Sequence, residues 1–140
     1  MTKTNNGPAE GSKGNPGGSS GRNAACGYAI WLNGETSNDK ILAREQEFVK
    51  YHERFDKNRN EIFHAGSGMI AGYYFGFGYY HAGLCAASTK SKEGAEALDN
   101  LVSQYLKFQK ESGEWESHPS CRLSNTAFGL LLMSLKLGDY

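Results

Sequence analysis

The chain has 140 residues, of which 39% are hydrophobic, and its 15 Lys and Arg residues balance 15 Asp and Glu residues. This length bounds the protein to one domain with a modest core, and the lack of net charge argues against a nucleic-acid surface or a polybasic membrane patch. The three cysteines are odd in number and far apart in the sequence. We therefore expect reduced core thiols and no disulfide framework.

Residues 1–20 consist largely of Gly, Ser, Asn and Pro without apolar periodicity. Such a segment buries too little apolar surface to offset the entropy of ordering it, which predicts a disordered arm over 1–20 and a folded domain over 21–140. The arm contains no apolar run of the signal-peptide kind. We expect no signal peptide and, by default, a cytoplasmic protein.

Apolar residues recur with the period of an α-helix through the predicted domain, and no strand-like alternation competes with them. Polar and small residues that cap or stop helices separate the periodic segments. The pattern predicts five helices, over 22–32, 38–55, 67–87, 91–110 and 123–137. Five helices with short links indicate an all-α fold of stacked antiparallel helical hairpins.

The predicted third helix lies in a stretch from Gly66 to Ser88 that contains no formally charged residue and is long enough to span a bilayer. Tyrosines and a histidine occupy its middle, whereas a membrane-spanning helix carries its tyrosines near the ends. Its glycines allow neighbouring backbones to approach closely. These features favour a buried inner helix over a membrane span.

The segment 109–115 lies between the predicted fourth and fifth helices. We expect Gln109 to end one helix and to hydrogen-bond backbone groups left open there. Gly113 is suited to a left-handed conformation that closes the helix, and Trp115 offers a large apolar surface with a single donor. The pattern predicts a compact junction with Trp115 buried against the fourth or fifth helix.

This junction resembles the Gln/Trp repeat of the terpenoid-cyclase and protein-prenyltransferase superfamily. The segment 73–82 resembles the Tyr/Phe/Gly-rich inner helix of bacterial proteins with prenyltransferase/squalene-oxidase-type repeats, and 124–131 and 18–25 are similar to further helices of these proteins. The resemblance covers about residues 15–138 and implies a partial α/α toroid. The repeat is imperfect, because Tyr105 and Leu106 stand one residue closer to Gln109 than is usual and no Asp precedes Gly113.

The aromatic residues of the predicted third helix are the first candidate site. Ring faces that line a cavity can hold an apolar or isoprenoid ligand, and the cavity of the toroid enzymes is aromatic. Packing between hairpins is the alternative, because consecutive helical residues point in all directions. The candidates for one cavity wall are Tyr73, Tyr74, Phe77 and Tyr80.

Two His/Cys pairs are weak candidates for a zinc site. His81 and Cys85 are four residues apart on one helical face, and His118 and Cys121 are three apart beyond the junction. The alternative is two unrelated pairs, and we expect no tightly held metal and no cofactor. The Asp-x-Asp-Asp box of the triterpene cyclases, an Asp-rich magnesium box and a nucleophile motif are absent from the sequence.

The resemblance and the missing boxes together predict a noncatalytic, terpenoid-cyclase-like helical repeat module that serves in binding or as a scaffold, or a fragment of a larger toroid. The alternative is the C-terminal part of a prenyltransferase-like or terpene-cyclase-like enzyme acting on an isoprenoid or other apolar substrate. An unfinished stack of repeats exposes apolar flanks. We therefore expect self-association or pairing with further toroid repeats.

Overall fold

The computed structural model describes residues 16–62 and 71–138. This part of the chain forms α1 (Pro16–Leu32), α2 (Asn38–Lys57), α3 (Tyr73–Ser88), α4 (Lys92–Leu106) and α5 (Arg122–Ser134), with a short 3₁₀ helix, η1 (Pro119–Cys121), before α5. Its β pairing is a single isolated bridge between Gln109 and Trp115. The predicted all-α fold with about five helices is confirmed.

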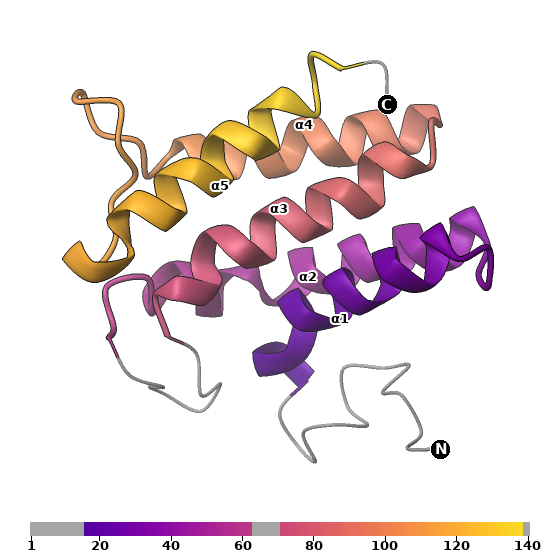
Figure 1. Ribbon diagram of the computed structural model, residues 1–140, viewed down its shortest axis with the longest axis horizontal. Helices are drawn as coiled ribbons and strands as arrows, with labels where there is room; N and C mark the ends of the chain where they lie inside the picture. Colours follow the sequence, from indigo (N-terminus) through magenta and orange to yellow (C-terminus); the bar gives the residue numbers. More distant parts are fainter. Residues whose placement is uncertain (1–15, 63–70, 139–140) are drawn as a thin grey trace.

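The helices form two layers of antiparallel hairpins (Figure 1). The helices α1, α3 and α5 lie side by side and run in one direction, while α2 and α4 lie behind them and run in the other. The central helix, α3, packs against all four others. The front layer of α1, α3 and α5 is called the inner layer below.

The two layers differ in charge because they differ in burial. The sequences of α1, α3 and α5 contain two formally charged residues, Arg22 and Arg122. In contrast, α2 buries Ile41, Phe48 and Phe55 on one side and carries its charged residues mainly on the other. Contact with four helices leaves α3 little surface for hydrated charge, which explains its uncharged sequence. None of the described helices is long and apolar enough to cross a membrane.

The first helix begins earlier than its apolar pattern predicts. It starts at Pro16 and not at Arg22, so residues 16–20 of the predicted disordered arm are helical. Proline is well suited to the first turn of a helix. Small side chains then let α1 approach α3, since Ser20 is fully buried and a Cβ added at Gly21 would lie 3.0 Å from Gly78 Cα. Residues 1–15 lie outside the described part of the chain.

Other predicted boundaries also shift, and the fifth helix ends at Ser134 and not at residue 137. The third helix begins at Tyr73, and residues 67–70 of its predicted start lie outside the described residues. The fourth helix ends at Leu106 and not at Lys110. Beyond it the chain makes a narrow loop in which Gln109 and Trp115 pair as an antiparallel bridge.

The junction therefore differs from the prediction in two of its three residues. Gln109 does not end the helix, and its side-chain Nε2 donates to the Gly113 carbonyl across the loop at 3.1 Å. Gly113 has the expected left-handed conformation, with φ of 86°, but it closes this loop and not a helix.

The predicted burial of Trp115 is confirmed. Its side chain is fully buried, and its indole Nε1–H donates to the Tyr105 carbonyl at 3.0 Å. The indole stacks on the Tyr105 ring at a centroid distance of 5.3 Å. On the α5 side, a Cβ added at Gly129 would lie 3.1 Å from the indole. Trp115 thus joins α4 to α5.

We predict that Trp115→Ala lowers the free energy of unfolding by roughly 3–5 kcal/mol, because it empties a fully buried site and removes the hydrogen bond to Tyr105. Denaturant unfolding followed by circular dichroism measures the change. The other tryptophan, Trp31, is half-buried on α1, so Trp31→Ala is the matched control and should have the smaller effect. A loss below ~1 kcal/mol for Trp115→Ala would contradict its role in packing.

Candidate functional site

The inner layer carries a connected row of rings, here called the aromatic stripe: Tyr74, Phe77, Tyr80 and His81 of α3 and Phe128 of α5. Phe77 lies 4.1 Å from His81 and 6.1 Å from Phe128 between ring centroids. Tyr80 lies 5.8 Å from Phe128, and Tyr74 lies 6.3 Å from Phe77. All five side chains are half-buried, so the stripe presents ring surface to solvent along α3 and α5.

The aromatic residues of α3 divide into two sets by helix geometry. Phe75 and Tyr79 point into the core and are fully buried. The four predicted cavity residues, Tyr73, Tyr74, Phe77 and Tyr80, lie on the outward side, and Tyr73 is 41% exposed. The four candidate residues thus share one face of the inner layer, whereas Phe75 and Tyr79 of the same helix pack in the core.

His81 extends the aromatic stripe as a neutral ring. Its Nδ1 lies 2.8 Å from the Phe77 carbonyl, so Nδ1 carries the proton and donates, and Nε2 has the free lone pair. Burial lowers the pKa of His81, and the bond to Phe77 only partly opposes this. The imidazole is therefore uncharged at neutral pH, in keeping with its ring neighbours.

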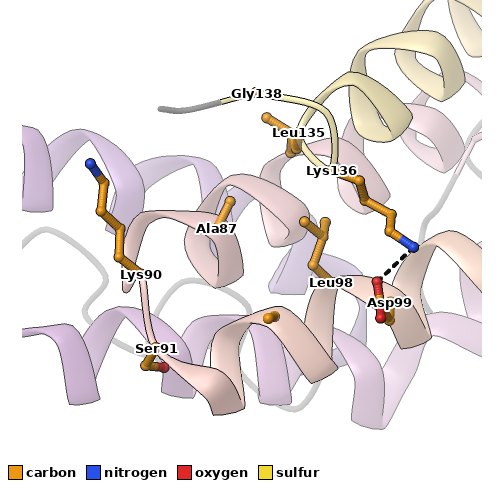
Figure 2. Close-up of a pocket in the computed structure, with 9 residues that line it drawn as sticks. Ala87, Lys90, Ser91, Leu98, Asp99, Leu135, Lys136 and Gly138 are labelled. Atoms are coloured by element: carbon orange, nitrogen blue, oxygen red, sulfur yellow. Dashed lines mark ion pairs between the residues drawn. The ribbon is translucent and has the colours of Figure 1, made fainter.

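Two grooves lie away from the stripe. One of about 500 Å³ lies between the turn that joins α3 to α4 and the C-terminal end of α5 (Figure 2). Its floor includes Leu98 and Leu135, and Lys136 Nζ lies 2.7 Å from Asp99 Oδ1 at its rim. The other, of about 560 Å³, lies between α1 and α2 and is lined in part by Glu35, Lys40 and Arg44.

The candidate zinc residues do not meet. His81 Nδ1 is turned to its own helix, and Cys85 is buried facing α1, with its Sγ donating to the Ala24 carbonyl at 3.3 Å. His118 Nδ1 accepts from the Ser120 amide at the start of η1. Within the described ranges, no three His, Cys, Asp or Glu side chains come together as a metal site.

A buried carboxyl group lies in the same region as Cys85. Glu45 of α2 is 3% exposed, and burial raises its pKa to about 7. Burial first, and then the charge of Glu45, raise the pKa of the Cys85 thiol to about 12. Cys85 is consequently a protonated thiol within the core.

A second polar group went unrecognised in the sequence. His52 and Asp56 are four residues apart on α2, with Nε2 and Oδ2 3.7 Å apart, and the Tyr79 hydroxyl donates to Asp56 Oδ1 at 2.9 Å. The i, i+4 spacing of His52 and Asp56 was the available signal. Burial raises the pKa of Asp56, and the bond from Tyr79 and the charge of His52 oppose this rise. His52, Asp56 and Tyr79 line neither of the two grooves. The bond from Tyr79 to Asp56 joins α3 to α2.

Asn125 connects the two helices that carry the aromatic stripe. Its Oδ1 accepts from the Gly76 amide at 2.9 Å, and its Nδ2 donates to the Gly72 carbonyl at 3.0 Å. The Tyr105 hydroxyl donates to the Asn125 carbonyl at 2.8 Å. The sequence favours a capping role for Asn125 within its own helix, but it caps the first turn of α3 from α5.

Comparison of the chain with protein-family models, with curated proteins and with solved structures finds no match. The terpenoid-cyclase-like relationship thus remains a prediction based on the sequence motifs.

We predict that Asn125→Ala lowers the free energy of unfolding by about 2–4 kcal/mol, because it leaves the Gly76 amide buried without its partner and opens a cavity. The neighbouring Ser124 is exposed on the same helix, so Ser124→Ala should cost less than about 1 kcal/mol. Thermal and urea unfolding compare the two variants. Equal effects would show that the bonds of Asn125 contribute little.

We predict that Glu45 makes the fold less stable as pH rises. Its pKa is raised from an ordinary 4.5 to about 7 on folding, so the folded state binds the proton more tightly. The resulting stability is fully present below about pH 4.5 and is lost as pH rises through about 7, a change of about 3 kcal/mol.

Glu45→Gln should be the more stable protein at pH 8, and its advantage over the wild type should shrink toward pH 5. Urea unfolding at a series of pH values measures this difference. Glu53, on the same helix, has a 73% exposed side chain, so Glu53→Gln should follow the wild-type pH curve. A Glu45→Gln curve parallel to the wild type would contradict the burial of an ionisable carboxyl group.

Proposed function

We propose that this protein is a noncatalytic helical repeat module that binds an apolar ligand, such as an isoprenoid chain, on its aromatic stripe. The observation that carries the proposal is the continuous, half-exposed row of rings on α3 and α5 in a layer almost free of charge. A hydrocarbon chain can contact these ring faces and edges over an extended surface. Its binding would strip water from few charged groups, because the layer is almost free of charge.

The surroundings of the stripe favour binding over catalysis. The sequences of α1, α3 and α5 contain no acidic residue that could act as a proton donor. The nearby thiols of Cys85 and Cys121 have pKa values raised by burial, which disfavours thiolate formation. His81 has a hydrogen-bond acceptor at Nε2 and can orient a ligand hydroxyl.

The alternation of the two layers supports the proposed relationship to α/α toroids. In such a ring, inner helices face the central cavity and outer helices face water. Here α1, α3 and α5 are nearly uncharged, whereas α2 carries charged residues along its length and α4 carries them over residues 92–99. We infer that the inner layer corresponds to the cavity side of a partial toroid.

A second candidate follows from the same layer. Joined to further repeats, the aromatic inner layer would form part of the cavity wall of a prenyltransferase-like or terpene-cyclase-like enzyme. The discriminating observation is the reading frame around Met1: additional Gln/Trp-type repeats and an acidic box upstream would favour the enzyme. These 140 residues would then supply part of the cavity wall, and the upstream repeats would supply the acidic box.

We predict that farnesol, used as a neutral isoprenoid probe, binds at the stripe and that Phe77→Ser combined with Tyr80→Ser weakens it at least tenfold. Loss of two ring contacts accounts for a change of that size. Chemical-shift titration measures affinity and location together. Tyr51, half-buried on α2 in the other layer, gives the control Tyr51→Ser, which should bind as the wild type does.

Two outcomes would contradict the proposal. One is the absence of farnesol binding to a folded wild-type protein. The other is equal weakening by Tyr51→Ser, because that would place the probe on a nonspecific apolar surface. Circular dichroism of each variant shows whether the fold is retained.

A further inference from the structure

The imidazole of His81 is the member of the aromatic stripe that carries a hydrogen-bonding atom of fixed role. Its Nδ1 lies 2.8 Å from the Phe77 carbonyl, which can only accept, so the ring proton is on Nδ1. The ring is neutral, because burial lowers its pKa and the bond to Phe77 only partly opposes this. Nε2 therefore has a lone pair and no proton, and it can accept a hydrogen bond but not donate one.

The Nε2 atom of His81 is open to solvent. Because Nδ1 is turned to the backbone of α3, Nε2 lies at the far end of the ring from that backbone. Within residues 16–62 and 71–138, the buried side-chain nitrogens without a hydrogen-bond partner belong to Asn23, Arg59 and Arg122. Nε2 of His81 also lacks a partner in that part of the chain, but it is not one of these buried atoms. A ligand that covers the ring removes water from Nε2 and has to replace the hydrogen bond that water provides.

The other polar groups of the stripe do not select for a donor in the same way. Tyr74 and Tyr80 have hydroxyl groups, which both donate and accept and so can serve an ether oxygen as well as an alcohol. Phe77 and Phe128 have no polar side-chain atom. The sequences of α1, α3 and α5 contain no carboxylate side chain. A preference for ligands with a hydrogen-bond donor therefore depends on His81.

We propose that the ligand of the aromatic stripe is an apolar alcohol whose hydroxyl group donates to His81 Nε2, an inference that rests on the binding function proposed above. The hydrocarbon chain of the ligand then lies along the rings that precede His81 on α3. Phe77 lies 4.1 Å from His81, and Tyr74 lies 6.3 Å from Phe77, between ring centroids. Since Tyr74 and His81 are two helical turns apart, this row offers about 10 Å of ring contact to the chain.

Ionised head groups fit this site less well than a hydroxyl group does. A carboxylate has no proton to donate, and its lone pairs would face the lone pair of His81 Nε2. An ammonium group can donate, but α1, α3 and α5 have no acidic residue to compensate a cation that loses its water there. A neutral hydroxyl group supplies the donor without that cost.

Farnesol and farnesyl methyl ether share one hydrocarbon chain and differ in the hydroxyl proton, so chemical-shift titration of the full chain with both tests the proposal. The wild type should bind farnesol about tenfold more tightly than the ether, as expected for one hydrogen bond to a half-buried acceptor. His81→Phe keeps a ring at this position without the acceptor, so it should bind the two probes about equally. Comparing the two proteins cancels the effect of the extra methyl group.

Tyr80→Phe is the matched control for His81→Phe, because the two rings are neighbours at a centroid distance of 5.2 Å and only a hydroxyl group is removed. This variant should retain the preference for farnesol over the ether. In the wild type, nuclear Overhauser contacts should join the C1 protons of farnesol to the His81 ring and its terminal methyl groups to Tyr74. That measurement needs no variant, and circular dichroism checks that both variants are folded.

The outcomes separate this proposal from the binding function on which it rests. If folded wild-type protein binds neither probe, the binding function is refuted and the alcohol with it. If farnesol and its ether bind the stripe equally, the binding function stands and the role of His81 is overturned. A preference for farnesol that survives His81→Phe, or tighter binding of farnesylamine than of farnesol, would also overturn it.

Discussion

The buried carboxamide of Asn125 completes the hydrogen bonding at the first turn of α3 from a helix 49 residues away in sequence. Tyr74 and Phe75 use the carbonyls of Ala71 and Gly72 for their amides, and Asn125 supplies the acceptor for the next amide, that of Gly76. This bond fixes the start of α3 to α5, and α3 in turn packs against every other helix. Glycine at position 76 is part of the same constraint, because a Cβ atom there would lie only 2.8 Å from Asn125 Oδ1.

Around this bond, burial decides where each kind of side chain is found. Tyr105 donates its hydroxyl to Asn125 and stacks its ring on Trp115, which joins the loop after α4 to the same centre. The rings that this centre cannot accommodate remain on the outward side of α3, where Phe77 and His81 meet Phe128. The aromatic stripe thus lies on the two helices, α3 and α5, that Asn125 joins.

Helical periodicity was sufficient to predict the all-α fold and the number of helices, because both depend on local spacing. The burial of Trp115 followed from its large apolar surface at the junction between two helices. The start of α1 was not predictable in this way, since Ser20 and Gly21 pack by being small and not by being apolar. The loop after α4 depends on the bridge between Gln109 and Trp115, which periodicity does not report. The candidate wall on α3 was placed on one face, but the buried Glu45 and the tertiary role of Asn125 arise only from contacts between helices.

The hydrogen bond from the Cys85 thiol to the Ala24 carbonyl gives the protein an internal reporter of local opening. The thiol is fully buried beneath α1, so an alkylating reagent reaches it only when α1 separates from α3. The rate of modification therefore measures the free energy of that separation, independently of global unfolding if the helix opens as a unit. Modification of Cys85 would therefore report the movement of α1 away from α3, a contact that includes small residues and one weak sulfur hydrogen bond.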